Sequence, residues 1–132
     1  MNGRFAVDTN AVVDYLRQSR STPPALLAAS EVFLPLTVLG ELFAGALASR
    51  RVSENLEAIE RLASMWTLLV PDADTARIYG RIRADERQRP AAEKASAKND
   101  LWIAAVCLQH GIALLTNDKA FEVIDGLQLV RW

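Results

Sequence analysis

The chain has 132 residues, 51% of them hydrophobic, and a formal net charge of −1. This length suits a single domain spanning residues 1–132 with a buried core, and the hydrophobic content excludes a disordered protein. The near-neutral charge excludes a global positive field, so any affinity for nucleic acid has to come from a local patch.

Short apolar segments alternate with longer helical patterns along the chain. We expect strands at 4–7, 32–34, 67–70, 112–115 and 127–130, and helices at about 11–17, 24–29, 37–49, 53–65, 73–87 and 99–110. Thr37 is the expected N-cap of the third helix, Asn99 or Ser96 that of the last, and Gly111 its C-terminal stop. This alternation predicts an α/β fold with right-handed crossovers and a parallel central sheet between helices.

The single cysteine, Cys107, lies in an apolar helical stretch and has no partner for an intrachain disulfide. The first residues acquire charge too early for a signal peptide, and no apolar run approaches the roughly 20 residues of a membrane span. We therefore expect a cytoplasmic protein that does not associate with a membrane.

Four acidic residues lie where a folded domain would bring them together. Asp8 follows the apolar run 5–7 and Asp118 follows 113–116, so both come directly after predicted strands. Sites in parallel sheets form beyond the carboxyl ends of the strands. Asp100 opens an apolar helix, and Glu41 is a lone charge within an apolar one. The pattern predicts a hard-cation site at the carboxyl edge of the sheet.

Each acid also has an ordinary structural explanation. Asp8 and Asp118 could cap the turns or helices that follow them, and Asp100 near a helix start favours the helix dipole. Glu41 is harder to explain in this way, because we expect its surroundings to be buried and an unpaired buried carboxylate is costly. The nearest arginines along its helix, Arg50 and Arg51, lie two turns or more away.

Taken together, the acids indicate a metal. Two carboxylates about 4 Å apart repel by roughly 4 kcal/mol at an effective dielectric near 20, and a divalent cation relieves this. Oxygen-only ligands select Mg²⁺ or Mn²⁺ over zinc. The only histidine, His110, is expected to cap a helix end, which argues against a histidine-based mechanism. The remaining chemistry is hydrolysis by metal-activated water, with a phosphodiester as the natural substrate.

A basic stretch precedes Asp100. Residues 77–98 contain seven basic residues against three acidic ones, in a chain whose total charge is negative. A solvated helix face with i,i+4 ion pairs explains most of them. Arg89, Lys94 and Lys98 flank the loop that leads into Asp100, so they are the better candidates for contacts with RNA phosphates.

Four motifs in order resemble the PIN domain. They are Asp8-Thr9-Asn10, Gly40-Glu41-Leu42, Asn99-Asp100-Leu101-Trp102-Ile103-Ala104-Ala105 and Leu115-Thr116-Asn117-Asp118. The length and motif order are similar to those of the toxins of bacterial VapBC toxin–antitoxin pairs. The resemblance covers essentially the whole chain, and it implies a Mg²⁺- or Mn²⁺-dependent endoribonuclease built as a three-layer α/β/α sandwich.

The resemblance also implies a role for each acid. Asp8 and Asp100 would be the direct metal ligands, and Glu41 would bind through water or orient the nucleophile. Asp118 would be the variable fourth acid, supporting a second, weaker metal position. The residues expected to hydrogen-bond the acidic cluster are Thr9 and Thr116, with Asn10 and Asn117 as lesser candidates.

The resemblance further implies a homodimer, because the toxins of VapBC pairs commonly form one. It also implies a VapB-like antitoxin, which inhibits such toxins by wrapping them with its C-terminal segment. The apolar positions of the helices at 37–49 and 53–65 fit such a groove, although core packing explains them equally well.

Other classes fit less well. The haloacid-dehalogenase pattern needs a second aspartate where this chain has Asn10. A receiver domain needs an acidic pair near its first strand, which is missing, although Lys119 is present. A PIN fold that binds a partner without cleavage is disfavoured by the complete set of acids. A PIN nuclease of RNA processing is disfavoured by the small size.

Overall fold

The computed structural model describes residues 3–18, 20–89 and 98–132. Within these ranges, five strands form one parallel sheet in the order β3-β2-β1-β4-β5. The strands are β1 (Arg4–Val7), β2 (Glu31–Pro35), β3 (Thr67–Leu69), β4 (Leu114–Leu115) and β5 (Leu129–Val130). The central strand is β1, in which Ala6 is in register with Phe33 of β2 and Leu114 of β4.

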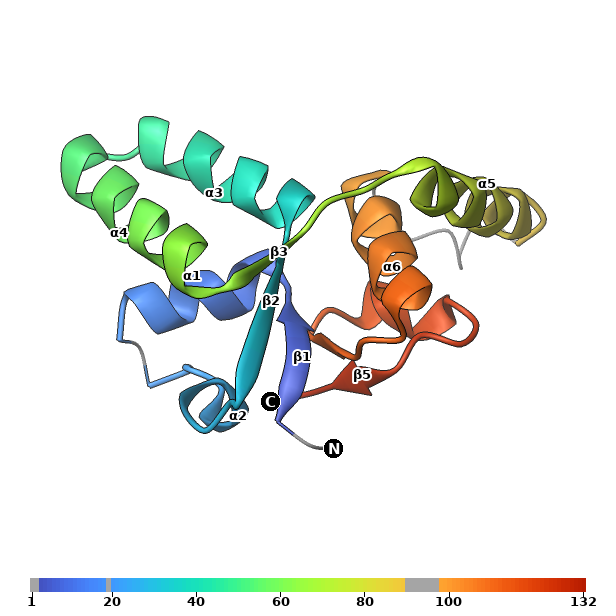
Figure 1. The fold of residues 1–132 in the computed structure, drawn as a ribbon, viewed down its shortest axis with the longest axis horizontal. Helices are drawn as coiled ribbons and strands as arrows, with labels where there is room; N and C mark the ends of the chain where they lie inside the picture. The colour runs from blue at the N-terminus through green and yellow to red at the C-terminus, as the bar shows by residue number, and fades with distance from the viewer. Residues whose placement is uncertain (1–2, 19, 90–97) are drawn as a thin grey trace.

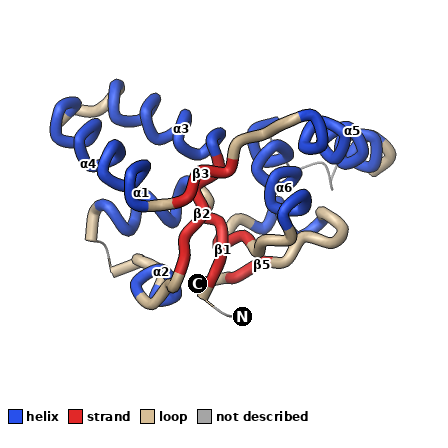
Figure 2. Tube along the Cα trace, in the orientation of Figure 1, coloured by secondary structure: helices blue, strands red, loops and turns tan. Residues whose placement is uncertain are grey.

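Helices cover both faces of the sheet (Figures 1 and 2). They are α1 (Thr9–Leu16), α2 (Pro24–Leu27), α3 (Leu36–Leu47), α4 (Val52–Met65), α5 (Ala73–Arg87) and α6 (Lys98–His110), with a 3₁₀ helix η2 (Lys119–Val123) after β4. In Figure 1, α1, α3 and α4 lie on one side of the strands, and α5 and α6 lie on the other. The predicted three-layer α/β/α sandwich with a parallel sheet is confirmed.

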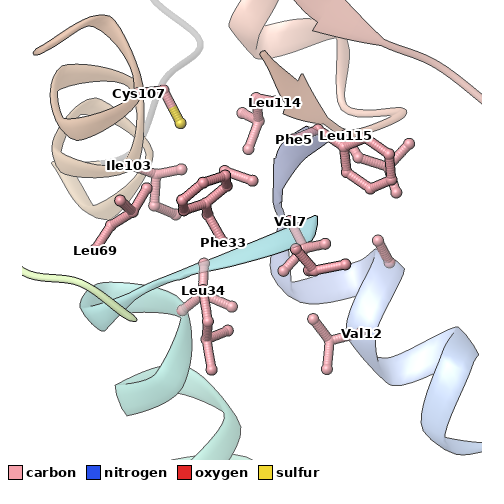
Figure 3. Close-up of a cluster of buried hydrophobic side chains, with 14 of the residues drawn as sticks. Phe5, Val7, Val12, Phe33, Leu34, Leu69, Ile103, Cys107, Leu114 and Leu115 are labelled. Carbon is pink, nitrogen blue, oxygen red and sulfur yellow. The ribbon is translucent and has the colours of Figure 1, made fainter. Parts of the chain in front are cut away.

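The core lies on both faces of the sheet, because successive strand residues point to opposite sides. Phe33 points toward Ile103 and Cys107 of α6, whereas the next residue, Leu34, points toward the opposite layer (Figure 3). Leu34 and Ile103 are fully buried. Burying a side chain of this size contributes about 1.5–3 kcal/mol, so this packing fixes α6 against β1 and β2.

Two helix starts differ from the sequence prediction. The third predicted helix, α3, begins at Leu36 directly after Pro35, without a side-chain cap, so Thr37 lies inside the helix and does not cap it. Proline holds the extended backbone that precedes a helix, which removes the need for a threonine cap here. Asn99 likewise lies within α6 and is not its N-cap, while Ser96 lies outside the described residues.

Other boundaries move by a few residues. The first helix begins at Thr9, earlier than predicted, because the side chain of Asp8 caps it. The predicted second helix ends at Leu27. The two C-terminal strands shorten to two residues each, since only those residues form ladder pairs. Gly111 follows the end of α6 with φ of +63°, a conformation that favours glycine.

Across the described ranges, none of the helices is both long and apolar enough to cross a membrane.

Candidate active site

Asp8 lies at the carboxyl end of the central strand and is buried, with 6% of its surface exposed. Its Oδ1 accepts a hydrogen bond from the backbone N–H of Thr9 at 2.8 Å, which caps α1. Its Oδ2 accepts one from the hydroxyl of Thr116 at 2.8 Å. Both carboxylate oxygens are therefore held in fixed directions by the start of α1 and the end of β4.

Burial raises the pKa of Asp8 above its ordinary value. The hydrogen bonds from Thr116 and Thr9 act in the opposite direction, because they stabilise the charged form. The negative charges of Asp118 and Glu41 raise the pKa further. Asp118 and Glu41 thus lie close enough to Asp8 for their charges to act on it, and the folded chain concentrates negative charge at this edge.

Thr9 connects Asp8 to Glu41. While its N–H donates to Asp8, its hydroxyl donates to Oε1 of Glu41 at 2.8 Å. Glu41 lies on α3 between the buried residues Leu39 and Leu42, but it is itself half-buried. Glu41 is therefore less buried than the sequence suggested. Its hydrogen-bond partner is the hydroxyl of a threonine on another helix, and not one of the arginines along its own helix.

Thr116 connects Asp8 to Asp118 on the opposite side. The Thr116 hydroxyl is fully buried and accepts a hydrogen bond from the backbone N–H of Asp118 at 3.0 Å while donating to Asp8. Asp118 in turn caps η2, because its Oδ1 accepts from the N–H of Ala120 at 2.9 Å. One threonine hydroxyl thus fixes the loop after β4 relative to the end of β1.

Asp100 lies in the first turn of α6 and is half-buried. The helix leads into β4, which is parallel to β1, so the N-terminus of α6 lies toward the carboxyl edge of the sheet. The neighbouring residues Leu101, Ile103 and Ala104 are fully buried, which anchors this turn to the core. The fold therefore places all four predicted acids at one edge of the sheet. The charges that raise the pKa of Asp8 are those of Asp118 and Glu41.

Cys107 is a neighbour of the site that sequence reasoning missed. Its thiol is buried, and burial raises the pKa of the thiol to about 12, with a smaller contribution from the charge of Asp8. A thiol with this pKa is protonated at neutral pH, so Cys107 is not a nucleophile. Its apolar helical surroundings predicted burial, but nothing in the sequence linked it to Asp8.

The asparagines predicted to support the acids and the basic residues predicted to contact RNA differ in exposure and in hydrogen-bond partners. Asn10 and Asn117 are exposed. Lys98 is exposed at the start of α6, and Lys94 lies outside the described residues. The guanidinium of Arg89 donates to the backbone carbonyl of Val123, which gives this arginine a structural partner. Contacts of these residues with RNA stay predictions.

A parallel α/β sandwich with a buried aspartate at the end of its central strand, and further acids at the same edge, is typical of metal-dependent hydrolases. The comparisons with known proteins agree. The family model for the PIN domain matches residues 5–127. Ribonuclease VapC5 of Mycobacterium tuberculosis is 33% identical over 108 residues, which cover 80% of this chain and 77% of that protein.

Two solved structures are also similar over 98% of both chains. The VapBC2 structure from Rickettsia felis, bound to a promoter DNA fragment, matches with a TM-score of 0.86 at 23% identity, which supports the fold. The DNA-bound VapBC structure from Salmonella typhimurium matches with a TM-score of 0.83 at 26% identity. The chain belongs to the PIN domain family, among its VapC-type ribonucleases.

Ribonucleases of this family generally depend on a divalent metal ion. Within residues 3–18, 20–89 and 98–132, no three histidine, cysteine, aspartate or glutamate side chains are grouped closely enough to hold a metal ion by themselves. The donors at the edge nevertheless fit a hard cation, because they are all oxygens around a buried, repelled carboxylate. Mg²⁺ is commonly bound through one or two carboxylates and retains several waters, so a closed cage of acids is not required.

Proposed function

We propose that this protein is a Mg²⁺-dependent endoribonuclease, with Mn²⁺ as the alternative cation, and the toxin of a type II toxin–antitoxin pair. The observation that carries the proposal is the position of Asp8. It is buried, held by two threonines and repelled by the charges of Glu41 and Asp118. A cation at this edge compensates the burial and the repulsion, which explains why the fold tolerates such a cluster.

The proposed ligands are Asp8 and Asp100, with Asp118 supporting a second, weaker position. A bound cation would activate water and offset the charge on the scissile phosphate. Thr9 donates to Oε1 of Glu41, so Glu41 would use Oε2 to orient the attacking water or to hold the cation through water. Water would then lose a proton and attack phosphorus while the bond from phosphorus to the 3′ oxygen breaks. The 3′ oxygen would take up a proton from solvent, leaving a 5′ phosphate and a 3′ hydroxyl.

Thr9 and Thr116 are proposed to keep the acids in this arrangement. Thr9 hydrogen-bonds the carboxylates of Asp8 and Glu41, whereas Thr116 hydrogen-bonds the carboxylate of Asp8 and accepts from the backbone N–H of Asp118. The carboxylates of Asp8 and Glu41 therefore do not rotate freely. Such supporting contacts matter because a ligand that rotates away from the cation loses much of its effect. Asn10 and Asn117, which lie next to these threonines in the sequence, are proposed as weaker supports.

The partners proposed are an RNA substrate, a second copy of the chain and a VapB-like antitoxin. The solved VapBC structures from Salmonella typhimurium and nontypeable Haemophilus influenzae, each 26% identical to this chain, support the antitoxin. We take residues 1–132 as one PIN-like domain, since the sheet combines β1 near one end with β5 near the other. A cytoplasmic location follows from these proposed partners.

The decisive experiment is cleavage of total RNA by the purified protein, with Mg²⁺ and with chelator. We expect cleavage in Mg²⁺ only, with a loss of about a hundred- to a thousand-fold in Asp8→Asn and Asp100→Asn, because removing a group that stabilises the transition state costs this much. The matched control is Asp85→Asn, which changes an exposed aspartate on α5. Cleavage that persists in chelator or in both variants would refute the metal-dependent mechanism.

A second experiment separates the toxin from an RNA-processing enzyme. Expression of the chain alone in bacteria should arrest growth, and co-expression with the small protein encoded directly upstream should restore it. Normal growth with active enzyme would favour a processing nuclease.

A further inference from the structure

A cavity next to Glu41 lies between three helices on one face of the sheet. It has a volume of about 310 Å³ and is lined by residues of α1, α3 and α4, which Figure 1 shows on the same side of the strands. Thr9 and Glu41, which hydrogen-bond each other at the acidic edge, are part of its lining. The volume lies within the range of pockets for small ligands, roughly 300–1,000 Å³. The cavity is thus continuous with the site of the acids.

The cavity follows one face of each of two helices. On α1, the lining residues Thr9, Val13 and Arg17 are spaced four residues apart. On α3, Glu41 and Gly45 have the same spacing, and residues four apart share a face of a helix. Eight residues of helix measure about 12 Å, so Arg17 lines the cavity well away from the acids.

Gly45 keeps the middle of the cavity open. A glycine inside a helix costs stability relative to alanine. A Cβ added at Gly45 would meet no other atom within 4 Å, so packing within the chain does not require glycine there. Because Gly45 lines the cavity, a larger side chain at this position would project into it. The glycine therefore preserves a volume that the fold by itself does not need.

The lining suits a flat heteroaromatic group. Its walls include the apolar side chains of Val13, Leu42 and Ile59, which can cover the faces of a ring. Arg17 adds a planar guanidinium whose N–H donors form a fixed fork. Across the described ranges, Arg17 forms no salt bridge. An unpaired base of RNA has a face that stacks and a polar edge that hydrogen-bonds, so it matches this division of the lining.

Asn55 complements Arg17. It also lines the cavity, and its side-chain N–H donates to the hydroxyl of Ser49 at 2.9 Å, so it would use its carbonyl oxygen to accept from a ligand. Guanine presents O6 and N7 as acceptors, which arginine binds in a bidentate way, and an N2 amino group that donates. Adenine has an amino group where guanine has O6. This set of donors and acceptors therefore favours guanine.

We propose that this cavity binds a guanine base of the RNA while a neighbouring phosphate lies at the acids, and that Arg17 selects the base. The inference rests on the proposed ribonuclease function and deepens it, because it assigns base selection to the faces of α1 and α3 next to Glu41. One strand reaches both places because Thr9 and Glu41 line the cavity as well as the acidic edge.

The test measures base preference without cleavage. Protein carrying Asp8→Asn is titrated into two fluorescently labelled RNA pentamers, UUGUU and UUAUU, with anisotropy as the readout. UUGUU should bind about five- to a hundred-fold more tightly, which is the discrimination that one bidentate contact gives. Adding Arg17→Lys keeps the charge but removes the fork, so the difference should fall below about two-fold. The matched control is Arg87→Lys, at an exposed position of α5, which should keep the preference.

Filling the cavity gives an independent test. Gly45→Leu in the same Asp8→Asn protein should lower the affinity for UUGUU to about that for UUAUU, because the base no longer fits. The matched control is Gly80→Leu, which adds the same side chain to α5 where a Cβ also meets no other atom, and it should keep the preference. If Gly45→Leu does not fold, as judged by thermal melts, Arg17→Lys decides, since Arg17 is exposed.

Equal affinity for the two pentamers before any further substitution would overturn the proposal. A guanine preference that survives Arg17→Lys, or that survives Gly45→Leu in a folded protein, would overturn it as well. The cavity would then have another occupant. Failure of the small protein encoded directly upstream to restore growth when co-expressed with Gly45→Leu, with RNA binding unchanged, would identify that occupant as a segment of the antitoxin.

The outcome is separable from that of the proposed function. A guanine preference that depends on Arg17, together with a wild-type protein that does not cleave RNA in Mg²⁺, would retain the base site and reject the nuclease. Cleavage by the wild type in Mg²⁺, with equal affinity for the two pentamers, would do the reverse.

Discussion

The hydroxyl of Thr9 donates a hydrogen bond to Oε1 of Glu41 at 2.8 Å, across the gap between the start of α1 and the middle of α3. The backbone N–H of the same threonine donates to Asp8. One residue therefore sets the relative orientation of two acids that lie 33 positions apart in the chain. In the proposed reaction the other oxygen of Glu41 accepts a hydrogen bond from water, which makes Thr9 a positioning residue.

Removing the Thr9 hydroxyl should lower cleavage without unfolding the protein. Thr9→Val keeps the shape and the backbone N–H but leaves Glu41 free to rotate, so we expect a loss of about 10–100-fold in kcat, as for other residues that orient metal ligands. Thr9→Ser restores a hydroxyl and should recover most of the activity. Single-turnover kinetics on a short RNA measure both variants, and full activity in Thr9→Val would show that the hydrogen bond is not needed.

Thr116 should be important for stability as well as activity. Its buried hydroxyl donates to Asp8 and accepts from the N–H of Asp118. Thr116→Val leaves that N–H without its acceptor, at a cost of about 1–3 kcal/mol in the free energy of unfolding. Urea denaturation measures the change, with Thr116→Ser as the control that retains the hydroxyl. A valine variant as stable as the wild type would mean that water replaces the lost acceptor.

Asp8→Asn should stabilise the metal-free protein at neutral pH even as it abolishes cleavage. The pKa of Asp8 in the folded state is raised above its ordinary value of 3.8, mainly by burial. The stability associated with its protonated form is present below the unfolded-state pKa and is lost as pH rises through the folded-state pKa. An uncharged asparagine avoids this loss, so the difference in Tm between variant and wild type should grow as the pH is raised from about 3 toward 7.

Thermal melts in chelator across that pH range provide the measurement. Addition of Mg²⁺ should then raise the Tm of the wild type and have a smaller effect on Asp8→Asn, because a ligand stabilises only a state that binds it. An identical response to Mg²⁺ in the two proteins would argue against Asp8 as a ligand.

Cys107 should be unreactive in the folded protein. Its thiol is buried and its pKa is raised to about 12, so almost no thiolate is present at neutral pH. A thiol-specific reagent such as a disulfide probe should label it only after denaturation, and Cys107→Ala should retain cleavage. Rapid labelling of the native protein would indicate that α6 opens locally.

The positions of three acids follow directly from local sequence patterns. An apolar run ending in Asp8, another ending before Asp118, and an apolar helix beginning near Asp100 each predict where a carboxylate leaves a secondary-structure element. The alternation of strands and helices predicts the parallel sheet. A helix that follows a strand carries the chain back across the sheet, so the next strand runs parallel to the first. These features depend on residues within a few positions of one another, so a sequence by itself contains them.

Only the tertiary structure decided how the acids are held. The pairing of Thr9 with Glu41 and the bridge from Thr116 to Asp8 join residues from different elements, and the order of the strands brings them together. The same packing brought Cys107 close enough to Asp8 for the charge of Asp8 to act on its thiol, and it stacked the partly exposed Trp102 on Tyr79. Local propensity determines where an element begins and which side chains it presents. The burial of long-range apolar contacts determines which of those side chains meet.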